Sequence, residues 1–156
     1  ATAASVRSGA YQRSLRQLDP DIAVTAKACP LFVPLVENGR FRRGDVVIET
    51  VAREYLEPLR REGLDTLILG CTHYPLLTDI IGDIMGPGVT LINTGEEAAW
   101  ELKRTLRGLD LLAPEGPAGR ATLCASDQPE QFGVMASYFL GESLTRPVQP
   151  VDIDRY

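Results

Sequence analysis

The chain has 156 residues, of which 44% are hydrophobic and 24% charged, enough for one domain with a core or for parts of two. Its formal net charge of −5 argues against a nucleic-acid-binding surface, which would be basic. No apolar stretch approaches the roughly 20 residues that a membrane span needs, and no signal-peptide pattern is present, so we expect no membrane partner.

The first part of the chain alternates helical patterns with short apolar runs. Residues 5–18 predict an amphipathic helix with Ser5 as its cap. Residues 22–25 predict a short strand, and residues 31–37, with their two prolines, a loop with one helical turn. Residues 44–61 predict the longest helix, whose inward positions are expected to be Val47, Val51, Tyr55, Leu56 and Leu59.

The alternation continues to the end of the chain. Strands are predicted at 65–69, 89–92 and 120–125, helices at 75–85, 95–106 and 127–140, a loop at 109–119 and a last extended piece at 148–153. Such alternation is typical of an α/β fold with a largely parallel sheet. Ligands of these sheets bind beyond the carboxyl ends of the strands, where Cys71-Thr72-His73, Cys29 and Asn93-Thr94 are expected to lie.

The run LILGCTHYPLL at residues 67–77 is the most informative motif. It joins an apolar strand to a helix opened by a proline, and it holds Cys71 and the chain's single histidine, His73. Unpaired N–H groups and the positive end of a helix dipole favour a thiolate at such a junction. Cys71 is therefore a candidate base or nucleophile, with an anion site beside it to which Thr72 could donate.

Each of these residues also has a purely structural interpretation. Cys71 could be a small buried residue at a tight turn, His73 a loop histidine bonded to a carbonyl, and Thr72 a helix cap. Glu37 is either a partly desolvated proton-transfer group or a solvated loop acid. For Cys29 and Cys124 we favour buried packing.

The cysteines and the remaining motifs set further expectations. Three cysteines with no disulfide spacing favour a reducing, cytoplasmic compartment. One histidine and scattered cysteines do not make a metal constellation, and there is no Gly-rich phosphate loop or Schiff-base lysine context. We therefore expect no cofactor and no metal.

The motif resembles the second active-site motif of glutamate racemases, in the aspartate/glutamate racemase family. The likeness extends to VRSGAY at 6–11, ACPLFVPLVE at 28–37, and Ser126-Asp127 with Phe132 and Leu140-Gly141. It implies a parallel-sheet racemase lobe of three αβα layers. It also implies a cofactor-independent, two-base racemisation of L-glutamate to D-glutamate for peptidoglycan synthesis.

Carried over residue by residue, the resemblance implies that Cys71 is one catalytic cysteine, supported by His73 and Glu37. Thr72 would bind the substrate carboxylate, with Thr2 and Ser5 lining the site. The resemblance further implies a homodimer for the full-length enzyme.

Two family motifs are absent, an Asp-Ser-Gly near the start and an Ala-Cys-Asn-Thr-like motif carrying the other cysteine. We therefore expect a C-terminal portion, with residues 1–93 forming most of the second lobe and residues 94–156 returning to a first lobe. Such a piece is expected to expose apolar surface and not to racemise glutamate alone.

Other functions stay open. A racemase acting on aspartate or another amino acid is the nearest alternative, although His73-Tyr74 favours glutamate. A Cys-His hydrolase or acyltransferase would need a third orienting residue and an oxyanion hole. A catalytically inactive carboxylate-binding module would bind glutamate without exchanging its Cα proton.

Overall fold

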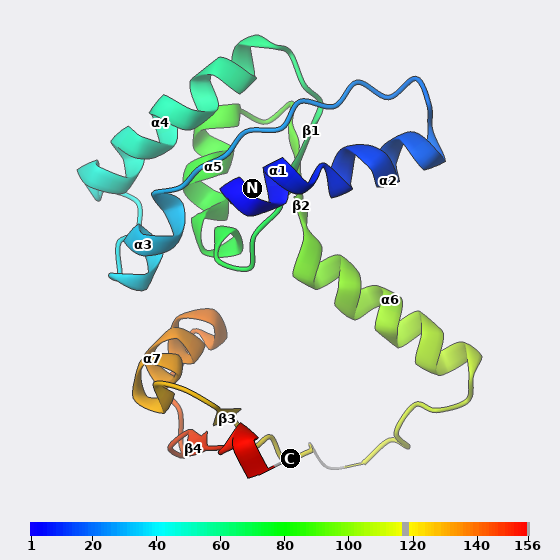
Figure 1. Ribbon diagram of the computed structural model, residues 1–156, viewed down its shortest axis with the longest axis vertical. Helices are drawn as coiled ribbons and strands as arrows, with labels where there is room; N and C mark the ends of the chain where they lie inside the picture. The colour runs from blue at the N-terminus through cyan, green and yellow to red at the C-terminus, as the bar shows by residue number, and fades with distance from the viewer. Residues whose placement is uncertain (117–118, 156) are drawn as a thin grey trace. The chain divides into compact units, whose positions relative to one another are not determined.

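The computed structural model describes residues 1–116 and 119–155. These residues form two compact units, Ala1–Leu111 and Leu112–Tyr156, each described here by itself. The elements of the first unit (Figure 1) are, in chain order, α1 Ala3–Ser8, α2 Ala10–Leu18, α3 Phe32–Glu37, α4 Val46–Arg61, β1 Thr66–Leu69, the 3-10 helix η1 Tyr74–Leu77, α5 Thr78–Met85, β2 Thr90–Asn93 and α6 Thr94–Gly108.

The two strands of the first unit run parallel, as the α/β prediction requires. Thr66 pairs with Thr90, and Leu69 pairs with Asn93 at the carboxyl end. The connection between them is η1 followed by α5, and α5 packs against α4. The predicted α/β class with parallel strands is confirmed.

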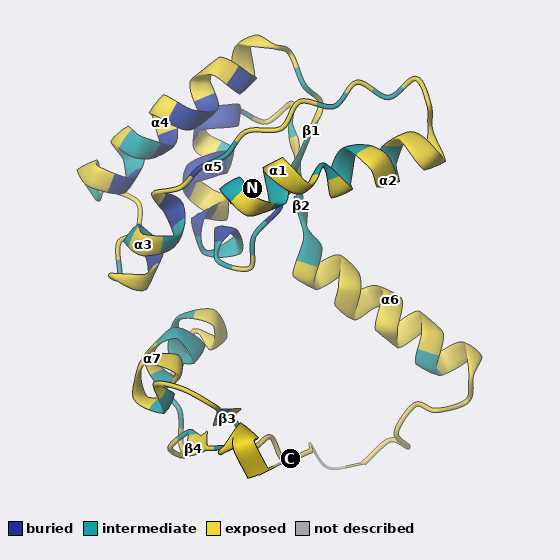
Figure 2. Cartoon of the chain, viewed as in Figure 1, coloured by how far each residue is buried: buried dark blue, intermediate teal, exposed yellow. Residues whose placement is uncertain are grey.

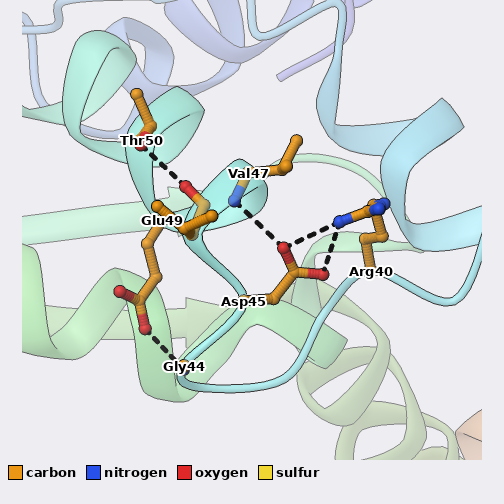
Figure 3. Close-up of polar contacts among 7 residues, drawn as sticks. Arg40, Gly44, Asp45, Val47, Glu49 and Thr50 are labelled. Carbon is orange, nitrogen blue, oxygen red and sulfur yellow. Dashed lines mark hydrogen bonds and ion pairs between the residues drawn. The ribbon is translucent and has the colours of Figure 1, made fainter.

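A polar network fixes the start of α4 (Figure 3). The Asp45 carboxylate accepts from the Val47 N–H at 3.0 Å and from Arg40 Nη1 at 3.0 and 3.1 Å. The Glu49 carboxylate accepts from the Gly44 N–H at 2.7 Å. These acids satisfy backbone donors at the positive end of the helix dipole, so the helix begins at Val46.

The core of the described residues lies in the first unit, on α3, α4, β1, η1 and α5 (Figure 2). All the buried hydrophobic residues fall between Cys29 and Met85, and Phe32, Ile48, Leu77 and Ile81 are at most 1% exposed. Tyr55, Leu56 and Leu59 of α4 are buried as predicted. Val47 is 39% exposed, because a helix that begins after the Asp45 cap turns Ile48 and Ala52 inward instead.

The predicted continuous helix over 5–18 is wrong. Gly9 has φ 62°, a left-handed conformation that glycine adopts without strain, and it separates α1 from α2. Ser5 is not the cap, since Thr2 precedes α1 and accepts from the Ser5 N–H at 3.2 Å.

The predicted strand at 22–25 is an extended segment without a ladder in the described part of the chain. Just beyond it, Lys27 accepts from the Ala1 nitrogen and Cys29 donates to the Ala1 carbonyl, both at 3.0 Å. A groove of about 590 Å³ lies between residues 22–27, α2 and β1. Extended backbone becomes a strand only where a partner pairs with it, which hydrophobic alternation cannot show.

The second unit contains β3 Cys124–Ala125, α7 Pro129–Leu140, β4 Gln149–Pro150 and the 3-10 helix Ile153–Arg155. Both strands pair in parallel, Cys124 opposite Gln149, and are shorter than the predicted 120–125 and 148–153. Part of the predicted loop at 109–119, residues 117–118, lies outside the described residues. The predicted division at residue 93 concerns membership of two lobes and stays a prediction; the compact units divide after Leu111.

Apolar side chains are exposed on α6 and on α7. On α6 Trp100 is 51% and Leu102 58% exposed, and on α7 Phe132 is 42% and Phe139 45% exposed. Neither helix contains a buried residue. That these faces form a seam with a first lobe stays a prediction. Within the described residues, every helix is too short or too polar to cross a bilayer.

Candidate active site

Cys71 follows β1 in a turn, not at the N-terminus of an α-helix. The Tyr74 N–H donates to the Cys71 carbonyl at 3.1 Å, and Tyr74–Leu77 form a single 3-10 turn before α5 begins at Thr78. The predicted helix over 75–85 therefore starts later than expected. The positive end of the α5 dipole lies at Thr78 and not at Cys71, so the predicted helix dipole at this thiol is wrong; Cys71 is surrounded by the local turn and by neighbouring side chains.

Those neighbours form a short polar chain. His73 Nε2 lies 3.2 Å from Glu37 Oε1, and His73 Nδ1 lies 3.9 Å from Cys71 Sγ and 3.3 Å from Thr72 Oγ1. The His73 side chain is 21% exposed and that of Glu37 39%. The structure thus brings four predicted site residues together, although they come from α3 and from the turn after β1.

The contact with Glu37 favours one tautomer of the neutral His73 ring. A carboxylate accepts hydrogen bonds, so Glu37 favours a proton on His73 Nε2, which leaves Nδ1 as an acceptor toward Cys71 or Thr72. The cysteine proton therefore has a nearby recipient. The Thr72 hydroxyl is exposed and does not cap a helix, because His73 holds the cap position of η1 and makes no side-chain cap bond.

Thr2 and Ser5 lie next to each other at the start of α1. Their hydroxyl oxygens are 3.0 Å apart, and both residues are partly buried. A Cβ built on Gly70 would lie 3.2 Å from the Ala1 Cβ, so the residue before Thr2 packs against the residue before Cys71. Their predicted role in substrate binding stays a prediction.

The other two cysteines differ from Cys71. Cys29 is 3% exposed, as the packing prediction expected, and burial raises the pKa of its thiol. Such a thiol is protonated at neutral pH and is a poor base. Cys124 is exposed, which contradicts the packing prediction: it lies on the two-residue strand β3, and none of the described residues of the second unit is buried.

Two further features bear on the site. In the described part of the chain, no group of three or more His, Cys, Asp or Glu residues could hold a metal ion. The sequence did not reveal the buried hydroxyl of Tyr74, which donates to the Cys29 carbonyl at 3.1 Å. The sequence contains no signal for this hydrogen bond, because the acceptor is the backbone carbonyl of a residue far away in the chain.

At the carboxyl edge of the sheet, the end of β2 and the start of α6 make hydrogen bonds that hold the local backbone. The Thr94 hydroxyl donates to the Leu69 carbonyl at 3.4 Å, and the Asn93 side chain accepts from the first N–H groups of α6 at 3.1 and 3.4 Å. Asn93 is thereby used as a helix cap. The pairing of Leu69 with Asn93 fixes the backbone from which the Cys71 turn departs.

A parallel α/β unit with a Cys-Thr-His turn beyond its first strand can hold a carboxylate and move a proton. No family model matches the chain. The chain is 42% identical over 143 residues to the glutamate racemase of Geobacter metallireducens, covering 92% of the chain and 52% of the relative. It is 44% identical over 152 residues to that of Mycobacterium ulcerans, covering 96% and 55%.

A solved structure gives the same likeness. Glutamate racemase from Francisella tularensis in complex with D-glutamate matches with a TM-score of 0.85 and 31% identity, covering all of this chain and 57% of that one. The chain is therefore homologous to the glutamate racemases, and it spans about half the length of the curated relatives it matches.

Proposed function

We propose that this chain supplies one half of the active site of a glutamate racemase, which interconverts L- and D-glutamate by a two-base cysteine mechanism. The observation that carries the proposal is the Glu37–His73–Cys71 chain at the carboxyl end of a parallel strand, in a chain homologous to glutamate racemases. The reaction class is a cofactor-independent amino-acid isomerisation.

Cys71 is the base of this half-site. Its thiol proton can pass to His73 Nδ1, at 3.9 Å, and the imidazolium that forms is stabilised by the Glu37 carboxylate at 3.2 Å from Nε2. The thiolate then removes, or the thiol returns, the Cα proton on one face of glutamate. His73 and Glu37 thus act as its acid-base support.

Thr72 binds the substrate carboxylate. Its hydroxyl is exposed beside Cys71 and can turn from His73 toward a ligand, since a hydroxyl both donates and accepts. Thr2 and Ser5 add hydroxyls on the neighbouring segment. Oriented donors at the carboxylate hold the Cα–H bond toward the thiolate and stabilise the negative charge that develops on deprotonation.

The second base comes from residues outside this chain. Cys29 is buried with a raised pKa, and the context of Cys124 lacks the family's first cysteine motif. The chain alone is therefore expected not to racemise glutamate. In the complete enzyme we propose a cytoplasmic homodimer that supplies D-glutamate for peptidoglycan synthesis.

Ligand titration tests which amino acid the half-site accepts. The chain has a single histidine, so the His73 imidazole gives one unambiguous set of NMR signals. Glutamate should shift these signals and the Thr72 amide signal, and aspartate should shift them less. Thr72→Val should abolish the response, while Thr78→Val, an exposed threonine whose hydroxyl bonds the Pro75 carbonyl, should leave it intact. A stronger response to aspartate would favour the related racemases.

A Cys-His hydrolase or acyltransferase is the competing enzyme class. It would release a burst of product from an activated ester in proportion to Cys71, whereas a racemase half-site would not. The Glu37–His73–Cys71 chain has the form of an orienting triad. Absence of an ester burst, with glutamate still shifting the His73 signals, favours the racemase.

A further inference from the structure

Tyr74 is buried directly beside the site and has a polar contact that the proposed chemistry does not use. The residue is 3% exposed, and its hydroxyl donates to the Cys29 carbonyl at 3.1 Å. Its own backbone N–H donates to the Cys71 carbonyl at 3.1 Å. Tyr74 therefore joins the Cys71 turn to the segment that precedes α3.

That segment determines where α3 lies. The Cys29 carbonyl also accepts from the Phe32 N–H at 3.3 Å, in the turn that opens the helix. The Phe32 ring packs edge-on against the Tyr74 ring, with centroids 5.2 Å apart and planes at 85°. The helix ends at Glu37, which contacts His73. Adjacent residues His73 and Tyr74 thus hold opposite ends of α3.

The two contacts differ in strength. The Glu37–His73 pair is partly exposed, and such pairs hold side chains weakly because water and salt compete for them. The hydrogen bond from the Tyr74 hydroxyl is buried. Its loss would leave the buried Cys29 carbonyl with one fewer hydrogen-bond donor, which is costly away from water. The position of α3 relative to the Cys71 turn therefore depends more on Tyr74 than on Glu37.

We propose that Tyr74 is a positioning residue, whose hydroxyl holds α3 so that the Glu37 carboxylate stays within hydrogen-bond distance of His73 Nε2. The value of this placement for proton transfer rests on the proposed function. The placement itself is a property of the folded chain.

The test compares three single-atom or near-isosteric variants by the His73 imidazole ¹H and ¹⁵N signals at one pH. Glu37→Gln defines the signals of a histidine without its carboxylate partner. Tyr74→Phe, which keeps the ring, should move the signals most of the way toward those of Glu37→Gln. Tyr55→Phe is the matched control: its ring also packs on Phe32, with centroids 5.4 Å apart, but its hydroxyl does not bond Cys29.

Three results would overturn the proposal. The His73 signals of Tyr74→Phe could match the wild type, or Tyr55→Phe could shift them equally. Tyr74→Phe could also lose its folding transition while Tyr55→Phe keeps it, which would assign the hydroxyl to the fold as a whole. The measurement uses no glutamate. It therefore tests the role of Tyr74 independently of the racemase function, and a negative result for either proposal leaves the other unaffected.

Discussion

Glu37 and His73 meet at 3.2 Å although Glu37 ends α3 and His73 lies in the turn after β1. The contact makes a carboxylate–imidazole pair whose far nitrogen faces Cys71. The fold therefore places the carboxylate and the imidazole of the proposed acid-base support beside Cys71. The reactivity of Cys71 is therefore the property of the candidate site that is easiest to measure.

Removing the Glu37 charge should slow alkylation of Cys71. In Glu37→Gln the imidazole loses the carboxylate that lies 3.2 Å from its Nε2, so His73 Nδ1 is a weaker acceptor for the Cys71 proton during the reaction. A partly exposed charged hydrogen bond contributes on the order of 1 kcal/mol, so the iodoacetamide rate at Cys71 should fall by roughly three- to tenfold. Glu54→Gln, on the exposed face of α4, is the control. An unchanged Cys71 rate would contradict the acid-base role.

Cys29 should make the fold sensitive to alkaline pH. Burial raises the pKa of its thiol in the folded state above its ordinary value of 9.0, so the folded chain holds this proton more tightly than the unfolded chain. The stabilisation is present below that value and is lost as pH rises through the folded pKa. Burial also raises the pKa of Tyr74, which extends the decline above its ordinary value of 10.0.

Urea unfolding at pH values from about 7 to 10.5 measures this effect. The free energy of unfolding should fall with rising pH, and Cys29→Ala should make the fall shallower. The folded wild type should alkylate at Cys71 and Cys124 but not at Cys29, which is 3% exposed. A stability that is flat with pH, or rapid labelling of Cys29, would show that this thiol is not buried in solution.

The Asp45 cap of α4 should contribute more to the free energy of unfolding than the ion pair between Asp45 and Arg40. Asp45→Ala removes the acceptor of the Val47 N–H and should cost about 1 kcal/mol of unfolding free energy. Arg40→Ala removes only the pair between Arg40 and Asp45, whose side chains are 48% and 23% exposed, and should cost less than about 0.5 kcal/mol. Equal losses in chemical denaturation would assign the stabilisation to the ion pair.

The contact between α4 and α5 should dominate the stability of the first unit. Ile81 is 1% exposed, so Ile81→Ala removes buried methyl groups and leaves a cavity, at a cost of about 3 kcal/mol. Val46→Ala, at a residue 71% exposed, should change stability by less than about 0.5 kcal/mol. A small loss at Ile81 would mean that this core is loosely packed in solution.

The sequence predicted most elements of the fold because their signals are local. Residues 44–61 have helical periodicity and an acidic start, and the apolar runs near 65–69 and 89–92 became β1 and β2. The periodicity of residues 5–18 predicts a helix through Gly9, because it does not show whether a single glycine continues a helix or breaks it. The apolar residues at 22–25 predict a strand that the described residues do not form, because strand pairing depends on a partner that the local pattern does not reveal.

The contacts among the candidate site residues were only partly predictable from the sequence. Cys71, Thr72 and His73 stand together in one motif, so their proximity follows from the chain itself. That Glu37 reaches His73, and Tyr74 the Cys29 carbonyl, depends on how α3 packs against the turn after β1. The expected α-helix dipole at Cys71 is absent because a 3-10 turn precedes α5, and turn type depends on hydrogen bonds that the motif does not specify.

Glutamate racemisation should require both this chain and a complementary half that supplies the second cysteine. This chain would be combined with the remaining half of the Mycobacterium ulcerans enzyme, to which it is 44% identical, and Cα–H exchange and loss of optical activity would be followed in deuterated water. We expect no turnover by the chain alone, turnover by the folded combination, and loss of turnover in Cys71→Ser but not in Cys124→Ser. Turnover by the chain alone, or by a combination carrying Cys71→Ser, would contradict this expectation.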